Sequence, residues 1–491
     1  MSLPRFRHLI DGELGDAAET FESLDPSTER PWALMPAANA EDVDRAVLAA
    51  DRALVDPAWA ELTPSARGKL LIRLGDLVGE AAQGLAELET RDTGKIIRET
   101  RAQIGYVADY YRYFGGLADK LQGAHLPVDK PDMDVTLRRE PIGVVAALVP
   151  WNSQMFLAAV KLGPALAAGC TVVLKASEDG PAPLLEFGRL IERAGFPRGV
   201  VNIVTGFGEP CGRALTSHPL VSRVAFTGGP ATARHIVRNT AENFAHTTLE
   251  LGGKSPVLVF ADADLDSVSN AIVAGIFAAS GQSCVAGSRL YVERPAYARL
   301  VAILKAKAEK IVIGDPQDVA TEMGPLATAR QRDGIEAVLA RSVEAGATLV
   351  TGGKRPAGQA RGFYFEPTIV ACPDNAVPCA REELFGPVLS VMPFDDEADA
   401  VAKANDSRFG LASGLFTTNL ARAHRIIRKL KAGVVWVNTY RAVSPIVPFG
   451  GSGQSGLGRE GGAESILDYT RVKAVWIRTS DDPIPDPFVM R

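Results

Sequence analysis

Apolar stretches of strand length alternate with amphipathic stretches along the chain from residue 142 onward. Ile142–Val149 is an apolar run, and Ala182–Ala194 has its apolar residues at helical spacing. Further strands are predicted over residues 171–175, 200–204, 221–227 and 247–251, with helices at 157–166, 210–217 and 231–239. Apolar strands that alternate with helices are typical of βαβ units on a buried parallel sheet.

A second series of the same kind begins after a break near Gly252–Ser255. Its predicted strands are 257–260, 289–292, 348–351, 388–393 and 434–437, and its predicted helices are 265–279, 296–310, 396–404 and 419–431. The chain before residue 142 differs. It has short strands with a hairpin turn at Asp11-Gly12, helices over 39–53, 64–91 and 96–120, and a strand hairpin over 121–140 that stands off the main body. The pattern predicts an α/β protein with two lobes.

Composition and charge narrow the possible functions. The 491 residues are 46% apolar and 23% charged, as in a soluble protein of two or three domains. A net charge of −5 argues against nucleic acid or an anionic membrane as partner. We expect neither a signal peptide nor a spanning helix. Five scattered cysteines fit a reducing cytoplasm, and their spacing to the histidines suggests no metal site.

Cys284 lies among small residues directly after a predicted helix. A single free cysteine is most often a small buried apolar residue, so its neighbours must decide its role. Asn152 and Glu250 each lie at the end of a predicted strand, and the ends of parallel strands meet at one edge of a sheet. A cysteine that attacks a carbonyl needs an oxyanion donor and a base for water. Asn152 and Glu250 are of the right chemical types for these two roles.

Other polar groups at strand ends are ambiguous on their own. Lys175 with Glu178 has the pattern of an ordinary surface pair, and the glycines around Gly208 form only a weak phosphate-loop signal. Ordered motifs spread over about 300 residues change this interpretation. They are Pro150-Trp151-Asn152, Lys161–Leu166, Lys175–Glu178, Phe226-Thr227-Gly228, Leu249–Pro256, Gly281–Cys284, Glu383–Pro387 and Pro448–Gly451. Through them the chain resembles the NAD(P)-dependent aldehyde dehydrogenase superfamily over essentially its whole length.

The resemblance implies two Rossmann-like, doubly wound parallel-sheet lobes with a β-hairpin oligomerisation arm. Residues 1–120 and 141–253 would form an NAD-binding domain and 254–454 a catalytic domain. Residues 121–140 and 470–491 would form the arm of a homodimer or homotetramer. The implied reaction is oxidation of an aldehyde to the acid.

Residue roles follow from the same resemblance. Cys284 would be the nucleophile, Asn152 and the Cys284 amide the oxyanion hole, Glu250 the base for thioester hydrolysis and Glu460 a proton relay. Cofactor contacts would come from Lys175 and Glu178 at the adenosine ribose, Glu383 at the nicotinamide ribose, and Trp151, Gly208, Phe226, Gly228 and Phe385 along the groove. The carboxylate of Glu178 favours NAD, because it suits a free 2′-hydroxyl; NADP stays possible.

Two departures from the family pattern weaken parts of this assignment. Gly229 stands where many relatives have serine, and Glu209 would repel a pyrophosphate unless its side chain points away. The aldehyde tunnel is predicted to be mostly apolar, for a medium-sized aliphatic or aromatic aldehyde. Its expected lining is residues 153–157, 160, 283, 285 and 439–447, with Arg441 turned to solvent rather than holding a substrate carboxylate.

Three alternatives stay open from the sequence. One is a CoA-acylating semialdehyde dehydrogenase on the same fold, against which the presence of a hydrolytic base at Glu250 argues. Another is a structural or binding protein that has kept the fold, against which the intact set of Cys284, Asn152, Glu250 and Glu383 argues. The third is thiol-dependent ester hydrolysis as a side activity of the same thiolate.

Overall fold

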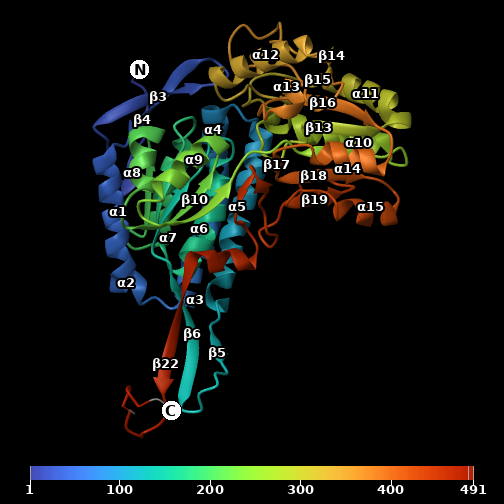
Figure 1. Ribbon diagram of the computed structural model, residues 1–491. Coiled ribbons are helices and arrows are strands. Elements are labelled where there is room, and N and C mark those ends of the chain that lie inside the picture. Colours follow the sequence, from blue (N-terminus) through green and yellow to red (C-terminus); the bar gives the residue numbers. More distant parts are fainter. Residues whose placement is uncertain (1, 485, 490–491) are drawn as a thin grey trace.

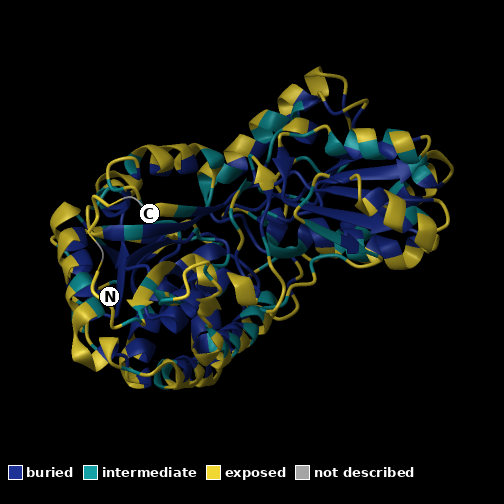
Figure 2. Cartoon of the chain, turned by 60° about the horizontal axis from the view of Figure 1, so that its bottom comes forward, coloured by how far each residue is buried: buried dark blue, intermediate teal, exposed yellow. Residues whose placement is uncertain are grey.

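Two lobes, each built around a mostly parallel sheet, lie side by side, and a narrow arm extends below the first (Figure 1). The computed structural model describes residues 2–484 and 486–489. Strands are buried at the centre of both lobes and exposed residues lie on the outer helices (Figure 2). The predicted α/β fold class with two doubly wound lobes is confirmed.

The sheet of the first lobe has the strand order β2-β1-β9-β8-β7-β10-β11-β21. Its five central strands run parallel, and antiparallel strands close both edges. The strands are β1 (His8–Ile10), β2 (Glu13–Gly15), β7 (Val144–Leu148), β8 (Thr171–Ala176), β9 (Val201–Thr205), β10 (Val221–Thr227), β11 (His246–Glu250) and β21 (Gly456–Leu457). The edge strand β21 comes from a late part of the sequence and pairs with β11. This pairing places the nearby segment around Glu460 on the first lobe.

Helices cover both faces of this sheet because its central strands are apolar on both sides. Val145 and Leu174 pack into one core and Val144 and Val173 into another on the opposite face. The helices are α1 (Ala40–Val55), α2 (Pro57–Ala60), α3 (Pro64–Glu80), α4 (Ala82–Thr93), α5 (Ile97–Leu117), α6 (Gln154–Ala168), α7 (Ala182–Ala194), α8 (Arg213–Thr216) and α9 (Pro230–Asn239).

The long helix predicted over residues 64–91 is wrong, because α3 and α4 are separate helices. The break falls at Ala81, whose ψ of 2° departs from helical geometry. Alanine favours helix and the apolar spacing continues across the break, so a local pattern does not predict it. Asn39 caps α1, since its side-chain oxygen accepts a hydrogen bond from the Asp42 amide at 2.9 Å.

The second lobe contains a seven-stranded sheet in the order β14-β15-β16-β13-β12-β18-β19, parallel except at β14. Its strands are β12 (Pro256–Val259), β13 (Arg289–Glu293), β14 (Thr348–Thr351), β15 (Thr368–Ala371), β16 (Val388–Phe394), β18 (Ala412–Phe416) and β19 (Val434–Val437). Helices again cover both faces: α10 (Leu265–Phe277), α11 (Arg294–Ala308), α12 (Ala329–Glu344), α13 (Pro378–Arg381), α14 (Glu397–Asn405) and α15 (Leu420–Ile427). Four of these elements, α12, α13, β15 and β18, were not predicted.

The arm is a three-stranded antiparallel sheet in the order β22-β6-β5. Its strands are β5 (Ala124–Leu126), β6 (Met133–Pro141) and β22 (Thr470–Arg478), and β22 pairs with β6 along its full length. The strand β22 therefore adds a third strand to the hairpin predicted over 121–140. Residues 485 and 490–491 of the predicted arm lie outside the described residues. Two-stranded sheets β3 (Glu19–Asp25) with β4 (Arg30–Ala37) and β17 (Phe409–Gly410) with β20 (Ser452–Gly453) complete the fold.

No helix within the described part of the chain is long and apolar enough to cross a membrane.

Candidate active site

A cavity of about 520 Å³ is lined by residues from both lobes. Cys284, Asn152, Glu250 and Glu460 all line it, although they come from four separate parts of the sequence. The structure thus brings together the four residues that the sequence suggested as catalytic. A cavity with an apolar lining and a few convergent polar groups is the usual form of a small-molecule site.

The loop that carries Cys284 is held in an unusual backbone conformation. After α10, Ala279 and Ser280 have φ of 51° and 53°, in the left-handed region that side chains disfavour. The Glu99 carboxylate accepts the Ala279 amide at 2.9 and 3.0 Å, which stabilises the turn. Gly281 also has positive φ, and a Cβ there would lie 2.1 Å from the Gly386 carbonyl oxygen. These contacts determine where the thiol points.

The Cys284 side chain is half-buried. Burial raises the pKa of the Cys284 thiol to about 12, and the nearby Glu383 and Glu250 carboxyl groups add to the rise. Arg441 acts in the opposite direction. The thiol must therefore transfer its proton when it attacks a carbonyl.

Asn152 follows β7 and is buried, as expected for a residue positioned by a strand end. Its side-chain nitrogen donates to the Gln282 carbonyl at 3.1 Å, which ties it to the Cys284 loop. An amide nitrogen has two hydrogens, so the second remains free to donate into the cavity. The neighbouring Ser153 hydroxyl donates to the Asn152 carbonyl at 2.6 Å.

Glu250 and Glu460 form a buried acidic pair, and Lys161 binds the second of them. Lys161, on α6, donates to the Glu460 carboxylate at 2.5 Å and to the Thr227 hydroxyl at 2.8 Å. Neither oxygen of Glu250 has a hydrogen-bond partner among the described residues. Burial, followed by the charge of Glu460, holds the pKa of Glu250 well above its usual range, while Lys161 and Arg459 oppose the rise. A carboxylate with a raised pKa is a stronger general base.

The first group of predicted cofactor residues lies along the carboxyl edge of the first sheet. Lys175 ends β8, is buried, and lies 3.5 Å from the Glu178 carboxylate. Gly208 follows β9, and no atom lies within 4 Å of the position that a Cβ would take there. Gly229 is equally open and precedes α9, whose N-terminus has no side-chain cap. Glu209 is exposed and lies 3.7 Å from Arg213, whose positive charge partly offsets its own.

The second group joins residues of both lobes where the sequence predicts the cofactor groove. The rings of Trp151 and Phe385 meet edge to face with centroids 5.5 Å apart. Glu383 accepts the Gly253 amide at 2.9 Å, and a Cβ at Gly252 would lie 1.8 Å from its carboxylate. Burial raises the pKa of Glu383 to about 7.

Phe226 and Gly228 are at the end of β10 on the same groove. A Cβ on Gly228 would meet the Phe226 ring at 2.3 Å, so only glycine permits this packing.

The predicted tunnel lining is correct in part. Ser153, Phe156, Leu157, Val160, Ser283 and Val285 line the cavity, as predicted. Gln154 and Met155 do not, because Gln154 bonds the Gly180 carbonyl and Met155 packs in the core of the first lobe. The interpretation of Arg441 as a solvent-facing residue is also corrected: its side chain is half-buried and lines the cavity.

Comparisons with known proteins agree with this geometry. Residues 14–475 match the aldehyde dehydrogenase family. The chain belongs to the aldehyde dehydrogenase family. It is 58% identical over 490 residues to the (Z)-2-((N-methylformamido)methylene)-5-hydroxybutyrolactone dehydrogenase of Acinetobacter baylyi, with 100% of each chain covered. The NAD+ complex of an aldehyde dehydrogenase from Bacillus cereus has a TM-score of 0.95 at 40% identity, with 97% of each chain covered.

A betaine aldehyde dehydrogenase from Staphylococcus aureus, solved in complex with NAD+, is also similar. It has a TM-score of 0.96 at 36% identity, with 99% of this chain and 96% of that chain covered. The family match confirms the predicted family resemblance. Both of these solved relatives bind NAD+.

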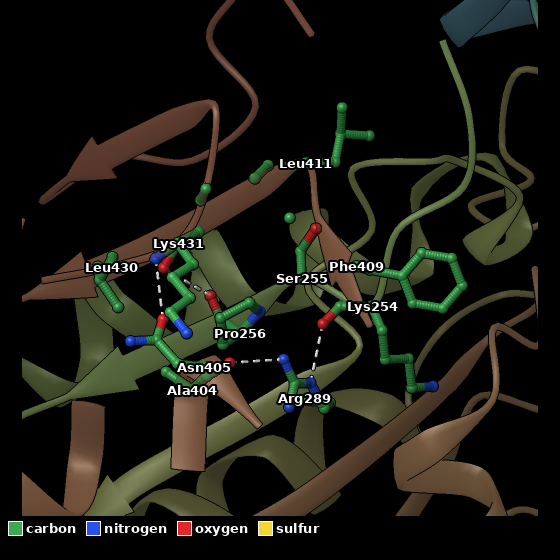
Figure 3. Close-up of a pocket in the computed structure, with 14 residues that line it drawn as sticks. Lys254, Ser255, Pro256, Arg289, Ala404, Asn405, Phe409, Leu411, Leu430 and Lys431 are labelled. Carbon is green, nitrogen blue, oxygen red and sulfur yellow. Dashed lines mark hydrogen bonds between the residues drawn. The ribbon is translucent and has the colours of Figure 1, made fainter. Parts of the chain in front are cut away.

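A much smaller pocket in this aldehyde dehydrogenase has a structural explanation. The pocket beside Arg289 has a volume of about 10 Å³. Figure 3 shows the Lys254 side chain directed away from Arg289. The Arg289 guanidinium donates to the Lys254 carbonyl at 2.8 Å and to the Ala404 carbonyl at 2.9 Å. Burial lowers the pKa of Lys254 to about 8. Backbone carbonyls accept these hydrogen bonds from the Arg289 guanidinium. The bonds, and not the small space beside them, stabilise the junction of β12 with the end of α14.

Sequence reasoning missed several polar residues of the site. Lys161 was quoted only as part of a motif, although a lysine on an otherwise apolar helix is a signal of a buried partner. Lys95, Glu99 and Gln103 were not considered at all, yet they line the cavity. They lie on α5 or just before it, in a segment whose helical pattern gave no indication of which side faces the site.

Proposed function

We propose that this chain oxidises an aldehyde to a carboxylic acid with NAD, using Cys284 as nucleophile. The observation that carries the proposal is the convergence of Cys284, Asn152 and Glu250 on one cavity between the lobes. A nucleophile, an oxyanion donor and a base are the three groups that acyl transfer requires. We assign residues 1–120 and 141–253 to cofactor binding and 254–454 to catalysis on the same basis.

Addition to the aldehyde begins with loss of the thiol proton. Glu250 lines the same cavity, and its raised pKa makes it a suitable acceptor, directly or through one water. The sulfur then forms a bond to the carbonyl carbon, and the carbonyl oxygen becomes an oxyanion. The free hydrogen of the Asn152 amide and the Cys284 backbone N–H stabilise that charge. Such donors are typically worth about 3–4 kcal/mol each in the transition state.

The groove fits NAD on two observations. The backbone at Gly208 and Gly229 is open, as close approach of a pyrophosphate requires. The carboxylates of Glu178 and Glu383 would accept hydrogen bonds from ribose hydroxyls, and Glu178 favours an unphosphorylated 2′-hydroxyl. Lys175, Trp151, Phe226, Gly228 and Phe385 would complete the groove. The chemistry that NAD supplies, when bound, is acceptance of a hydride.

Hydrolysis of the resulting Cys284 thioester needs an activated water. Glu250 takes a proton from water, the hydroxide oxygen bonds to the acyl carbon, and the Cys284 sulfur leaves. Glu460 and Lys161 form a buried polar connection beside Glu250, and we assign Glu460 the relay of the proton away from it. A hydrolytic base in this position supports release of a free acid over transfer to CoA.

The Acinetobacter relative suggests a substrate class. A 5-hydroxybutyrolactone, as in that relative's name, is a cyclic form that opens to a chain with an aldehyde at one end and a carboxylate at the other. At 58% identity, we propose that this chain also accepts a substituted semialdehyde of this kind. The small side chains of Ser153 and Val160 leave room for a substituent.

The test is an aldehyde panel that includes succinic semialdehyde, with NAD or NADP, monitored by absorbance of the reduced cofactor. Equal moles of NADH and acid support the proposal. Absence of cofactor reduction with every aldehyde favours a structural role, and acyl-CoA formation in the presence of CoA favours the CoA-acylating alternative.

We further propose that the arm formed by β5, β6 and β22 mediates a homodimer or homotetramer. Val472, Trp476 and Ile477 are 50–54% exposed on β22, and apolar side chains exposed together mark interaction surfaces.

A cytoplasmic location is proposed from the cysteines, all five of which are free thiols.

A further inference from the structure

Two basic side chains, Lys95 and Arg441, line the cavity around Cys284, and their surroundings differ. Lys95 is buried and lies 3.0 Å from the Glu89 carboxylate, with a second bond to the Gln103 side-chain oxygen at 2.6 Å. Its charge is therefore compensated within the protein. Glu99, on the same wall, has both carboxylate oxygens on the Ala279 amide.

Arg441 has no carboxylate within 4.0 Å among the described residues. Its only protein hydrogen bond within that part of the chain joins one terminal nitrogen to the Ala274 carbonyl at 3.0 Å. A guanidinium has five N–H donors, so four of them have no protein acceptor within the described part of the chain. The side chain is half-buried, where the attraction between opposite charges is stronger than in water.

The backbone around Arg441 is fixed relative to the nucleophile. The preceding residue, Tyr440, donates from its hydroxyl to the Val285 carbonyl at 2.9 Å, and Val285 directly follows Cys284. The following residue, Ala442, accepts the Trp436 indole N–H at 2.9 Å. Arg441 itself has φ of 62°, which costs energy in a non-glycine residue and is maintained by these two bonds. The backbone of Arg441 is thus held at a defined place in the wall of the cavity that Cys284 also lines.

We propose that Arg441 binds a carboxylate on the substrate, so that the preferred substrates are oxo acids with an aldehyde at the other end. This inference rests on the proposed aldehyde oxidation. Arginine binds carboxylates through two parallel hydrogen bonds, which orient as well as attract. In the balanced reaction, the oxo acid, NAD+ and water give a dicarboxylate, NADH and two protons. The carboxylate on Arg441 is unchanged, and it positions the aldehyde carbon at Cys284.

The test compares succinic semialdehyde, its methyl ester and butanal as substrates of the wild-type protein, Arg441→Gln and Arg441→Lys. We expect the wild type to favour the acid over the ester by about 10- to 100-fold in kcat/KM, which corresponds to one charged hydrogen-bonded contact. Arg441→Gln should remove this preference through KM, so that acid and ester are used about equally; the loss of the arginine charge near the Cys284 thiol acts on all three substrates alike and cancels in the ratio. Arg441→Lys should restore part of it, because the charge remains without the fork geometry.

Arg98→Gln is the matched control. Arg98 also donates to a backbone carbonyl, that of Thr321 at 2.7 Å, but does not line the cavity. This variant should keep the preference for the acid. Equal use of acid and ester by the wild type, or a preference that survives Arg441→Gln, would overturn the inference while leaving aldehyde oxidation intact. Absence of NADH with all three aldehydes would instead overturn the proposed function, and the inference with it. Butanal turnover reports whether each variant is folded.

Discussion

Glu250 and Glu460 share one buried region, yet only Glu460 has an ion-pair partner. Lys161 lies 2.5 Å from Glu460, whereas both Glu250 oxygens lack hydrogen-bond partners among the described residues. Burial and the neighbouring charge raise the pKa of Glu250 as a result. A carboxyl group left unpaired in a buried site is costly for folding and is typical of functional positions. The asymmetry of the two carboxyl groups supports Glu250 as the base.

Glu250→Gln should uncouple thioester formation from hydrolysis. The amide cannot take a proton from water, so the acyl group should remain on Cys284. We expect steady-state turnover to fall at least about 100-fold, the range of a lost general base. Because Glu250 also accepts the thiol proton, rapid mixing of enzyme, aldehyde and NAD should still give a burst of NADH but a slower one than in the wild type, with solvent water taking the proton instead. Cys284→Ala, as control, should abolish both burst and turnover. Wild-type turnover in Glu250→Gln would remove Glu250 from this role.

Lys161→Met should shift the pH dependence of the reaction. Lys161 lowers the pKa of Glu250, so its loss should raise that pKa further. Because the base works only when ionised, the acidic limb of the plot of kcat against pH should move to higher pH. An unpaired Glu460 should also cost about 3–5 kcal/mol of folding free energy. Chemical denaturation and a pH–rate profile measure the two effects. The double variant Lys161→Met with Glu460→Gln should regain stability. An unshifted pH–rate profile in Lys161→Met would contradict the effect of Lys161 on the pKa of Glu250.

Cofactor binding should depend on the ionisation of Glu383. Its pKa is raised to about 7, chiefly by burial. The ionised carboxylate accepts two ribose hydroxyl hydrogens, whereas the protonated acid is a weaker acceptor. The KM for NAD should therefore increase as pH falls through about 7, and Glu383→Gln should show little pH dependence in this range. Initial rates at varied NAD between pH 5.5 and 8.5, roughly the window around a raised carboxyl pKa, provide the check. A flat profile in the wild type would argue against Glu383 as a ribose ligand.

Gly252→Ala should weaken cofactor binding without altering the fold. The added methyl would lie 1.8 Å from the Glu383 carboxylate and displace it. We expect the KM for NAD to rise about tenfold or more, as expected for loss of one charged hydrogen bond. Gly105→Ala on α5 is the control, because nothing lies within 4 Å of a Cβ there. That change should leave KM unchanged and stabilise the helix by about 1 kcal/mol. Equal KM values in the two variants would refute the displacement.

Local patterns predicted the elements that position the site, but contacts between distant residues were not predictable. The runs that became α7 and β10 have clear apolar periods, and both were predicted with their correct bounds. The strand β18 was missed because Ala412, Ser413 and Gly414 are small and have weak strand preference. The ion pair of Lys161 with Glu460 joins residues 299 positions apart, so no local pattern contains it. Family motifs identified the catalytic groups, whereas the cavity position of Arg441 required the structure.

Trp476→Glu should dissociate the proposed oligomer. Trp476 is 54% exposed near the far end of β22, and in a dimer its indole would be buried against a second copy. A buried, unpaired carboxylate costs several kcal/mol, which is enough to separate subunits at micromolar concentration. Light scattering after size-exclusion chromatography gives the mass of the species. Val319→Glu, at a site that is 56% exposed and outside the arm, is the control and should leave the mass unchanged. A monomeric wild type, or an oligomer that persists in Trp476→Glu, would show that the arm is not the interface.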